Sequence, residues 1–309
     1  MILLFSNLSA QESKLTHRAV CKYPTNISFK YSCSEQTNTE RINEKKENFV
    51  FNRSSETFFS MRNTELSKSE FQKIEVKTDS IHHTLEAGGK KWYYHTRVAD
   101  IVSAWNEDVE QYQIPMSRTF DYWISPYFEF ADLIPIKQLE IDRNDIEKSK
   151  AKMSASDYLI WRNSLSDERL YHLTDVKKIE FPVNRMPKDT VWNSPIEFQV
   201  NGVTFYDTVQ VKFADERGGY IFMETSFKAK RFLKDSVIIY GYRQQPVQAV
   251  DADLDCTYKL TITPQGTIED AVLEATGYIK FAYKSESIVE FTDKIKTKTI
   301  WKQLGRYNW

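Results

Sequence analysis

The chain has 309 residues, of which 41% are hydrophobic and 28% are charged, a composition typical of a folded protein with a sizeable core. Its 42 basic and 43 acidic residues leave a formal charge of −1, which argues against nucleic-acid partners and against electrostatic binding to an anionic membrane. Only nine glycines are present, under half the usual frequency of about 7%, which argues against phosphate-binding loops and dinucleotide folds. We expect no cofactor.

Residues 1–11 are interpreted as a possible truncated export leader. Ile2 to Phe5 form a short apolar stretch, and Leu8-Ser9-Ala10 resembles the small-residue end of a signal peptide, although a basic n-region is missing. A buried first strand or helical turn is the alternative. The sequence has no run of 18 apolar residues, so we expect no membrane-spanning helix. The leader interpretation predicts an extracytoplasmic protein, located in the periplasm, on the cell surface or outside the cell.

Residues 12–90 are dominated by Ser, Thr, Asn, Glu and Lys. A segment so poor in apolar residues buries too little surface to offset its chain entropy, which is typical of a linker, a stalk or loosely packed strands. The stretches ENFVFN, ETFFSM and FQKIEVKT interrupt it with β-forming character. We therefore predict a polar N-terminal arm with two or three short strands.

Two of the three cysteines fall in this arm. A disulfide between Cys21 and Cys33 would close a short loop and stabilise the arm by about 3 kcal/mol in the chain-entropy model, leaving Cys256 unpaired. Three unlinked thiols are the alternative, because an odd count does not indicate a disulfide scaffold.

The spacing of apolar residues predicts that residues 91–175 form a small helical, aromatic-rich region. Apolar residues recur every three or four positions between 98 and 112, which predicts a helix that Pro115 ends. A second helical stretch is predicted over 154–174, where Ser154 is the candidate N-cap and Asp157 stands at the capping-box position.

Residues 176–309 alternate polar and apolar residues in eight or nine short runs joined by turns such as DERGG and TPQG. Because turns rather than helices join the runs, the sheet is predicted to be mostly antiparallel. The fold class is α+β: a mostly antiparallel β sandwich, or a barrel-like sheet, as the C-terminal domain, a small helical middle and a polar arm.

The aromatic middle offers a candidate ligand-binding surface. Aromatic rings stack on the apolar faces of sugars, and carboxylates at Asp121, Glu129 and Asp132 stand beside several of them. The same aromatic clusters often close hydrophobic cores instead. The candidate ligand-binding residues are Trp92, Tyr94, Tyr122, Trp123 and Tyr127.

Asp251, Asp253 and Asp255 resemble the start of a calcium-binding loop, and they are the candidate metal ligands. The glycine expected at the sixth position and the glutamate expected at the twelfth are absent, so a charged strand edge is the alternative. His82 and His83 point to opposite faces of any strand, which argues against joint chelation.

The C-terminus, TIWKQLGRYNW, resembles the aromatic-ended terminal strand of outer-membrane barrels. The strands before it carry charges on both faces, as in YIKFAYKSESIVEF, and this favours a soluble sandwich over a lipid-facing surface.

The leading functional hypothesis is an exported, non-enzymatic envelope or cell-surface protein that binds a protein, glycan or lipid partner or has a structural role. Its β-rich domain or aromatic middle would provide the surface. Two alternatives are a carboxylate-based enzyme acting on a glycan or peptide and a subunit of a larger structural assembly. The scarcity of catalytic motifs favours a binding protein over the enzyme alternative.

Overall fold

The computed structural model describes residues 16–17, 19–20, 22–96, 107–125, 127, 130–135, 137–184, 186–242 and 245–308. The candidate leader, residues 1–11, lies outside these ranges. No helix among the described residues is both long enough and apolar enough to cross a membrane.

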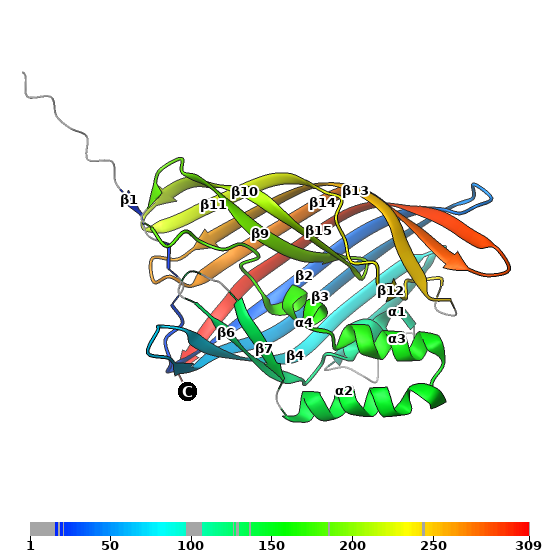
Figure 1. Cartoon of the computed structure of the whole chain (residues 1–309), viewed down its shortest axis with the longest axis horizontal. Coiled ribbons are helices and arrows are strands. Elements are labelled where there is room, and N and C mark those ends of the chain that lie inside the picture. Colours follow the sequence, from blue (N-terminus) through cyan, green and yellow to red (C-terminus); the bar gives the residue numbers. More distant parts are fainter. Residues whose placement is uncertain are drawn as a thin grey trace, which may run out of the picture.

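Most of the described chain forms one antiparallel sheet of 13 strands (Figure 1). Along the sheet the order is β7-β6-β4-β3-β2-β15-β14-β13-β11-β10-β9, with β5 paired to β4 and β12 paired to β13. A separate two-stranded pair joins β1 to β8. The strands are β1 (Thr16–His17), β2 (Ile27–Ile42), β3 (Asn48–Leu66), β4 (Gln72–Ala87), β5 (Lys90–His95), β6 (Thr119–Ile124), β7 (Phe130–Pro135), β8 (Met186–Pro187), β9 (Val191–Val200), β10 (Val203–Arg217), β11 (Tyr220–Ala229), β12 (Ser236–Val237), β13 (Val247–Ile262), β14 (Ile268–Lys284) and β15 (Ile288–Asn308).

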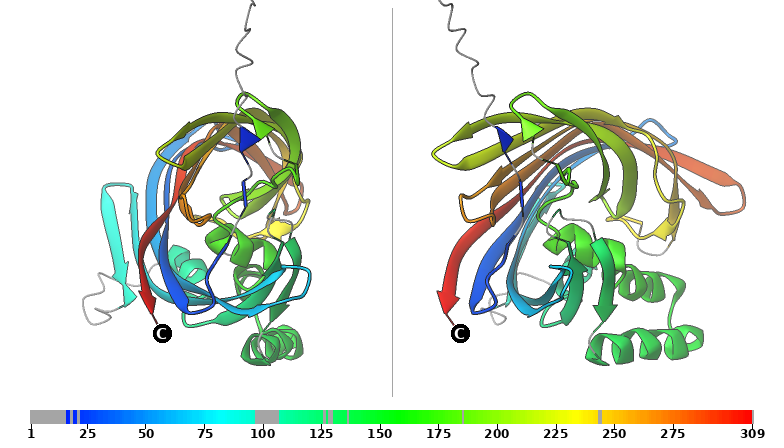
Figure 2. Two further views of the ribbon diagram at one scale, coloured as in Figure 1. Left: turned by 90° about the vertical axis from the view of Figure 1, so that its left-hand side faces the viewer. Right: turned by 60° about the vertical axis from the view of Figure 1, so that its left-hand side comes forward.

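The large sheet is strongly curved, and the helices gather at its open side (Figure 1 and Figure 2). They are α1 (Glu107–Gln113), α2 (Lys137–Ser149), the short 3₁₀ helix η2 (Lys150–Lys152), α3 (Ala155–Ser164) and α4 (Asp167–Thr174). Of these, α2 lies below and outside the curve. This architecture confirms the predicted α+β, mostly antiparallel fold class. Of the two expected forms of the sheet, the single curved sheet is the barrel-like one.

The segment predicted as a polar arm with short strands instead contains three long strands, so the prediction of short strands is wrong. β2, β3 and β4 have 16, 19 and 16 residues. β2 pairs along its length with β15, so residues 27–87 belong to the same sheet as residues 191–308. The strands were hard to recognise because polar residues occupy both faces in parts of β2 and β3, which removes the alternation that predicts a strand.

The helical region follows the sequence pattern in part. α3 begins after Ser154, whose side chain accepts a hydrogen bond from the backbone N–H of Asp157, as predicted. The expected single helix over 154–174 is divided in two, because Ser166 caps a new helix, α4. α1 ends just before Pro115, and residues 97–106 of the first predicted helix lie outside the described ranges.

The hydrophobic core lies between the concave face of the sheet and the helices. It contains the inward-facing residues of β13 and β14, for example Leu254, Tyr258 and Leu273, together with Leu170 and Leu173 of α4. Trp301 of β15 is fully buried and donates its indole N–H to the carbonyl oxygens of His172 and Leu173. This bond helps to fix α4 against the sheet.

Candidate functional site

A band of polar side chains crosses the concave face of the sheet. The strand register places Thr299, Glu35, Ser55 and His83 side by side on β15, β2, β3 and β4. A neighbouring row contains Thr297, Thr37 and Arg53. Buried polar groups need partners, so this polar band requires polar side chains from other elements, or bound molecules, to satisfy it.

Two helices bring charged side chains onto this band. α4 carries Arg169 and His172 above Glu35, and α1 carries Asp108 and Tyr112 above Arg53. Each helix is therefore fixed to the sheet through an ion pair that joins distant parts of the sequence.

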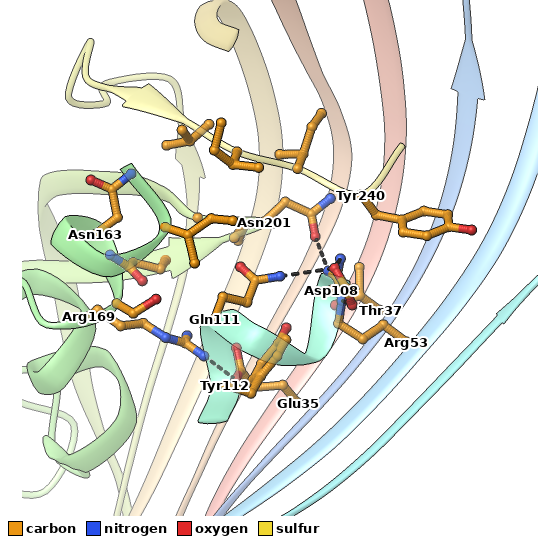
Figure 3. Close-up of a pocket in the computed structure, with 18 of the residues that line it drawn as sticks. Glu35, Thr37, Arg53, Asp108, Gln111, Tyr112, Asn163, Arg169, Asn201 and Tyr240 are labelled. Atoms are coloured by element: carbon orange, nitrogen blue, oxygen red, sulfur yellow. Dashed lines mark hydrogen bonds and ion pairs between the residues drawn. The ribbon is translucent and has the colours of Figure 1, made fainter. Parts of the chain in front are cut away.

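A cavity of about 70 Å³ lies between the polar band and the helices (Figure 3). Its polar lining includes Glu35, Thr37, Arg53, Asp108, Gln111, Tyr112, Asn163, Arg169 and Asn201. Its apolar lining is supplied by Leu159, Ile160, Val200, Val237, Ile238 and Ile239. The cavity thus has one charged side and one aliphatic side.

Glu35 is held by three protein groups. Its carboxylate accepts hydrogen bonds from His172 Nε2 at 3.1 Å, from Arg169 Nη2 at 3.3 Å and from Ser55 Oγ at 3.4 Å. Burial alone would raise the pKa of this carboxyl, but the Arg169 charge and the His172 hydrogen bond hold it well below its usual range. Glu35 is therefore ionised at neutral pH.

His172 has both ring nitrogens engaged. Nδ1 accepts the backbone N–H of Gln199 at 3.0 Å, so Nε2 carries the proton and donates it to Glu35. Burial lowers the pKa of His172 to about 4, which keeps the ring neutral at neutral pH. Neither nitrogen can take a proton from a ligand without breaking one of these bonds.

Asp108 and Arg53 form a second buried pair. Arg53 donates Nε and Nη2 to the two carboxylate oxygens at 2.7 and 2.6 Å, and its Nη1 donates to Asn201 at 3.0 Å. Gln111 Nε2 and His83 Nε2 also lie near the carboxylate, at 2.9 and 3.3 Å. The Arg53 charge holds the pKa of Asp108 well below its usual range, although burial opposes this.

Tyr112 lies between the two ion pairs. Its ring centre is 5.0 Å from the Arg169 guanidinium, 5.8 Å from that of Arg53 and 4.8 Å from the His83 ring. Its side chain is 6% exposed, and burial keeps the pKa of the hydroxyl raised. No hydrogen bond to this hydroxyl is found among the described residues, and Tyr112 lines the cavity.

These protonation states limit the chemistry that the cavity can perform. A carboxyl group that serves as a general acid needs a raised pKa, whereas both Glu35 and Asp108 are kept ionised and are bound by arginines. Neither carboxyl group is therefore suited to act as a general acid at neutral pH.

The five predicted aromatic ligand residues do not form one surface. Trp92 pairs with Leu85 near one end of β4, and Trp123 pairs with Lys73 near the other end. Twelve residues along β4 separate these positions by about 40 Å at ~3.4 Å per residue.

The predicted tyrosines serve mainly as packing residues. Tyr122 is buried in the main core, and Tyr94 is buried in a smaller cluster with Val109 and Tyr112. Tyr127 is half-buried, and its carbonyl accepts a hydrogen bond from the backbone N–H of Phe181. These positions do not support a shared sugar platform.

The three predicted metal ligands lie along β13 and contact cations or a hydroxyl. Asp253 and Asp255 pair with Lys228 at 3.7 and 3.0 Å, and Asp251 accepts a hydrogen bond from the Tyr278 hydroxyl at 2.9 Å. No group of three or more His, Cys, Asp or Glu side chains suited to holding a metal ion occurs in the described part of the chain.

Cys33 is a buried free thiol, and Cys21, its suggested disulfide partner, lies outside the described residues. The two adjacent histidines do face opposite sides of β4. His82 stacks on His95 with ring centres 3.9 Å apart, whereas His83 is buried beneath α1.

Sequence reasoning missed the residues that form the cavity. Glu35, Thr37 and Arg53 stand in the segment interpreted as a polar arm, and Arg169 lies on the predicted helical stretch over 154–174, where no binding residue was predicted. The available signal was the alternation of charged and hydroxyl residues at every second position of SCSEQTNTERI, which places Glu35, Thr37, Thr39 and Arg41 on one face of a strand.

Comparison with known proteins gives no family for this chain. No family model matches it, and no curated protein matches it. Among solved structures, a lipovitellin structure concerned with lipid–protein interactions superimposes with a TM-score of 0.46 at 9% identity, covering 93% of this chain. The chain spans about a quarter (26%) of the length of that lipovitellin chain.

Two other solved structures superimpose on this chain with lower TM-scores. The β domain of the Bordetella autotransporter BrkA gives a TM-score of 0.22 at 7% identity and covers 91% of this chain and 99% of its own. OccAB4 of Acinetobacter baumannii gives 0.17 at 7% identity, with coverages of 92% and 99%. At these values the likenesses say nothing about ligand or activity, so function is argued from the cavity alone.

Proposed function

We propose that this protein is a non-enzymatic binding protein that holds a small molecule in the cavity on the concave side of its sheet. The observation that carries the proposal is the two-sided lining: ion-paired polar groups from β2, β3, α1 and α4 face aliphatic side chains from α3, β9 and the segment around β12. Ligand pockets characteristically combine an apolar wall with a few converging polar groups.

A buried acceptor atom without a hydrogen-bond partner supports the proposal that the cavity holds a further molecule. Gln199 is 8% exposed and lines the cavity, and among the described residues its Oε1 atom has no hydrogen-bond partner. Its Nε2 donates to Thr204 at 3.1 Å, so the amide is held in place. A buried acceptor without a partner costs about 1–3 kcal/mol, which an ordered water held in the cavity beside a ligand would recover.

The volume limits the size of the ligand. A water molecule needs about 10–15 Å³ of cavity volume, so about 70 Å³ accommodates about five to seven non-hydrogen atoms. An adjacent cavity of about 420 Å³ shares Asn163, Gln199, Gly202 and Val237 with it, and these residues separate the two spaces.

The test is a ligand-observed NMR screen of a fragment library against the full chain, together with a variant whose cavity is filled. Val237 is buried and lines the cavity, so Val237→Phe should abolish the binding of hits. Val250→Phe makes the same change on an exposed strand position and should leave binding intact. Hits that bind both variants equally would contradict the proposal, as would a screen without hits.

An extracytoplasmic location is part of this proposal and rests on the residues near the N-terminus, from Ile2 to Ala10. Cell fractionation with an antibody to the native protein, expressed from its own locus, tests it. Recovery in the periplasm, on the surface or in the medium is expected, and recovery with cytoplasmic markers would overturn it.

A further inference from the structure

We infer that the ligand of this cavity is a short-chain aliphatic carboxylate, bound through Arg169 and the hydroxyl of Tyr112. The inference rests on the proposed binding function and deepens it by naming the chemical class. It is argued from the hydrogen-bonding groups that the cavity leaves available.

Three arginines line the cavity, and they differ in how fully they are engaged. Arg41 and Arg53 each form a two-point ion pair with an aspartate, and each gives a further hydrogen bond through Nη1, to the Tyr240 carbonyl and to Asn201. Among the described residues, the Arg169 guanidinium has one hydrogen-bond acceptor, Glu35. A guanidinium has five N–H donors, so most of those of Arg169 remain available.

The Tyr112 hydroxyl is a second available donor on the same side. The Tyr112 ring packs against the Arg169 guanidinium, so both groups face the same part of the cavity. The nearby carboxylates of Glu35 and Asp108 already accept hydrogen bonds from protein donors. This side of the cavity therefore offers donors, and a ligand must bring the acceptors.

A carboxylate matches this arrangement best. Its two oxygens accept from a guanidinium and a hydroxyl together, and charge-assisted bonds to arginine are about twice as strong as neutral ones. An ammonium group would bring only donors to a region that already contains two arginines. The opposite wall, which includes Leu159, Ile160 and Val200, would contact an alkyl chain.

The cavity volume sets the chain length. About five to seven non-hydrogen atoms correspond to propanoate, butanoate and pentanoate, which have five, six and seven. Each added methylene should increase affinity about fourfold while the aliphatic wall still has room for it. Longer chains should then lose affinity.

The experiment is an NMR titration of the full chain with the sodium carboxylates from propanoate to octanoate, and with pentan-1-ol and pentylamine. We expect affinity to rise to a maximum at butanoate or pentanoate, and pentanol and pentylamine to bind at least tenfold more weakly than pentanoate. Equal or tighter binding of pentanol or pentylamine would overturn the carboxylate assignment, as would affinity that rises steadily to octanoate.

Tyr112→Phe removes one hydroxyl and keeps the ring that packs between the arginines. It should weaken pentanoate binding about five- to tenfold and leave pentanol binding unchanged, whereas Tyr220→Phe, on an exposed tyrosine, should change neither. Equal affinity of the Tyr112→Phe variant and the parent for pentanoate would contradict the role of the hydroxyl.

Arg169→Gln should lower pentanoate affinity further, provided that circular dichroism shows it folded. If other fragments bind in a Val237-dependent way and carboxylates do not, the proposed function stands and this inference fails. If nothing binds, both fail.

Discussion

His172 on α4 and Glu35 on β2 lie 3.1 Å apart, Nε2 to Oε1, and together they fix the helix to the concave face of the sheet. The imidazole is neutral and the carboxylate is charged. Because the backbone N–H of Gln199 occupies the other ring nitrogen, this tautomer is built into the fold. The pair lies beside the cavity, so its protonation should influence both stability and binding.

Stability should fall as the pH decreases from 6.5 to about 4. Burial lowers the pKa of His172 from its ordinary 6.5 to about 4, so within this window the unfolded state binds a proton that the folded state does not. The free energy of unfolding is unaffected by His172 above pH 6.5, and it should decline by up to about 3 kcal/mol by pH 4. Urea unfolding measured across this range tests the prediction.

A His172→Gln variant removes the titrating ring, so its unfolding free energy should change much less between pH 6.5 and 4. His82→Gln, at a half-exposed histidine, should keep the slope of the parent protein. The depressed pKa of Glu35 adds a separate loss that begins below its ordinary 4.5, so it does not explain a slope above that pH. Equal slopes for parent and His172→Gln would contradict the assignment.

Asp108→Asn should destabilise the protein by about 3–5 kcal/mol, because it leaves the buried Arg53 guanidinium without its counter-charge. The double variant Arg53→Met/Asp108→Leu should be more stable than Asp108→Asn alone. The exposed pair Lys91–Glu86 is the matched control, and Glu86→Gln should cost no more than about 1 kcal/mol. Chemical denaturation measures all three, and similar losses at both pairs would refute the prediction.

Gly277→Ala should be among the more destabilising substitutions in the sheet, by about 2–3 kcal/mol. Gly277 pairs with Leu254 across β13 and β14, and a methyl group there would overlap the carbonyl oxygen of Asp253. At Gly88, in the turn between β4 and β5, a methyl group would meet nothing within 4 Å, but the backbone has φ +56°. Gly88→Ala should therefore cost only about 1–2 kcal/mol, the strain of a left-handed residue. Thermal unfolding that ranks the two variants in the opposite order would disprove this account.

Cys33 and Cys256 should resist alkylation in the native protein. Burial raises the pKa of the Cys33 thiol well above its ordinary 9.0 and raises that of Cys256 to about 12, so little thiolate exists at pH 8. Peptide mapping after iodoacetamide treatment should find both unmodified until denaturant is added. Ser54→Cys, at an exposed position of β3, should react at once; rapid labelling of Cys33 in the folded chain would contradict its burial.

The β fold could be predicted where inward and outward positions differ in polarity. In β13, buried Leu254, Tyr258 and Leu260 alternate with polar residues, so the strand was recognisable. In β2, the charged residues Glu35 and Arg41 face inward, so the strand lacks the alternation of apolar and polar residues that predicts one. The N-cap Ser154 was predictable because its hydrogen bond is local, whereas the pairing of β2 with β15 depends on residues at opposite ends of the sequence.

The site itself could not be derived from sequence spacing. Glu35 meets Arg169 and His172 across more than 130 positions, and Arg53 meets Asp108 across 55. Such contacts are fixed by sheet curvature and helix placement, and no local motif encodes them. The aromatic residues predicted as ligand-binding include Tyr94 and Tyr122, which are buried in the fold. Large aromatic side chains of this kind usually pack in the hydrophobic core.

The adjacency of β2 and β15 at the centre of the sheet also governs how the chain can assemble. On the ribosome, β2 is made well before its partner strand, which follows residue 287, so one edge of the nascent β2–β4 hairpins stays open while the residues between β4 and β15 are translated. Closing so long a loop is slow, and open strand edges invite pairing between chains. Biogenesis of this protein should therefore depend on keeping that open edge apart from other nascent chains until β15 has been made.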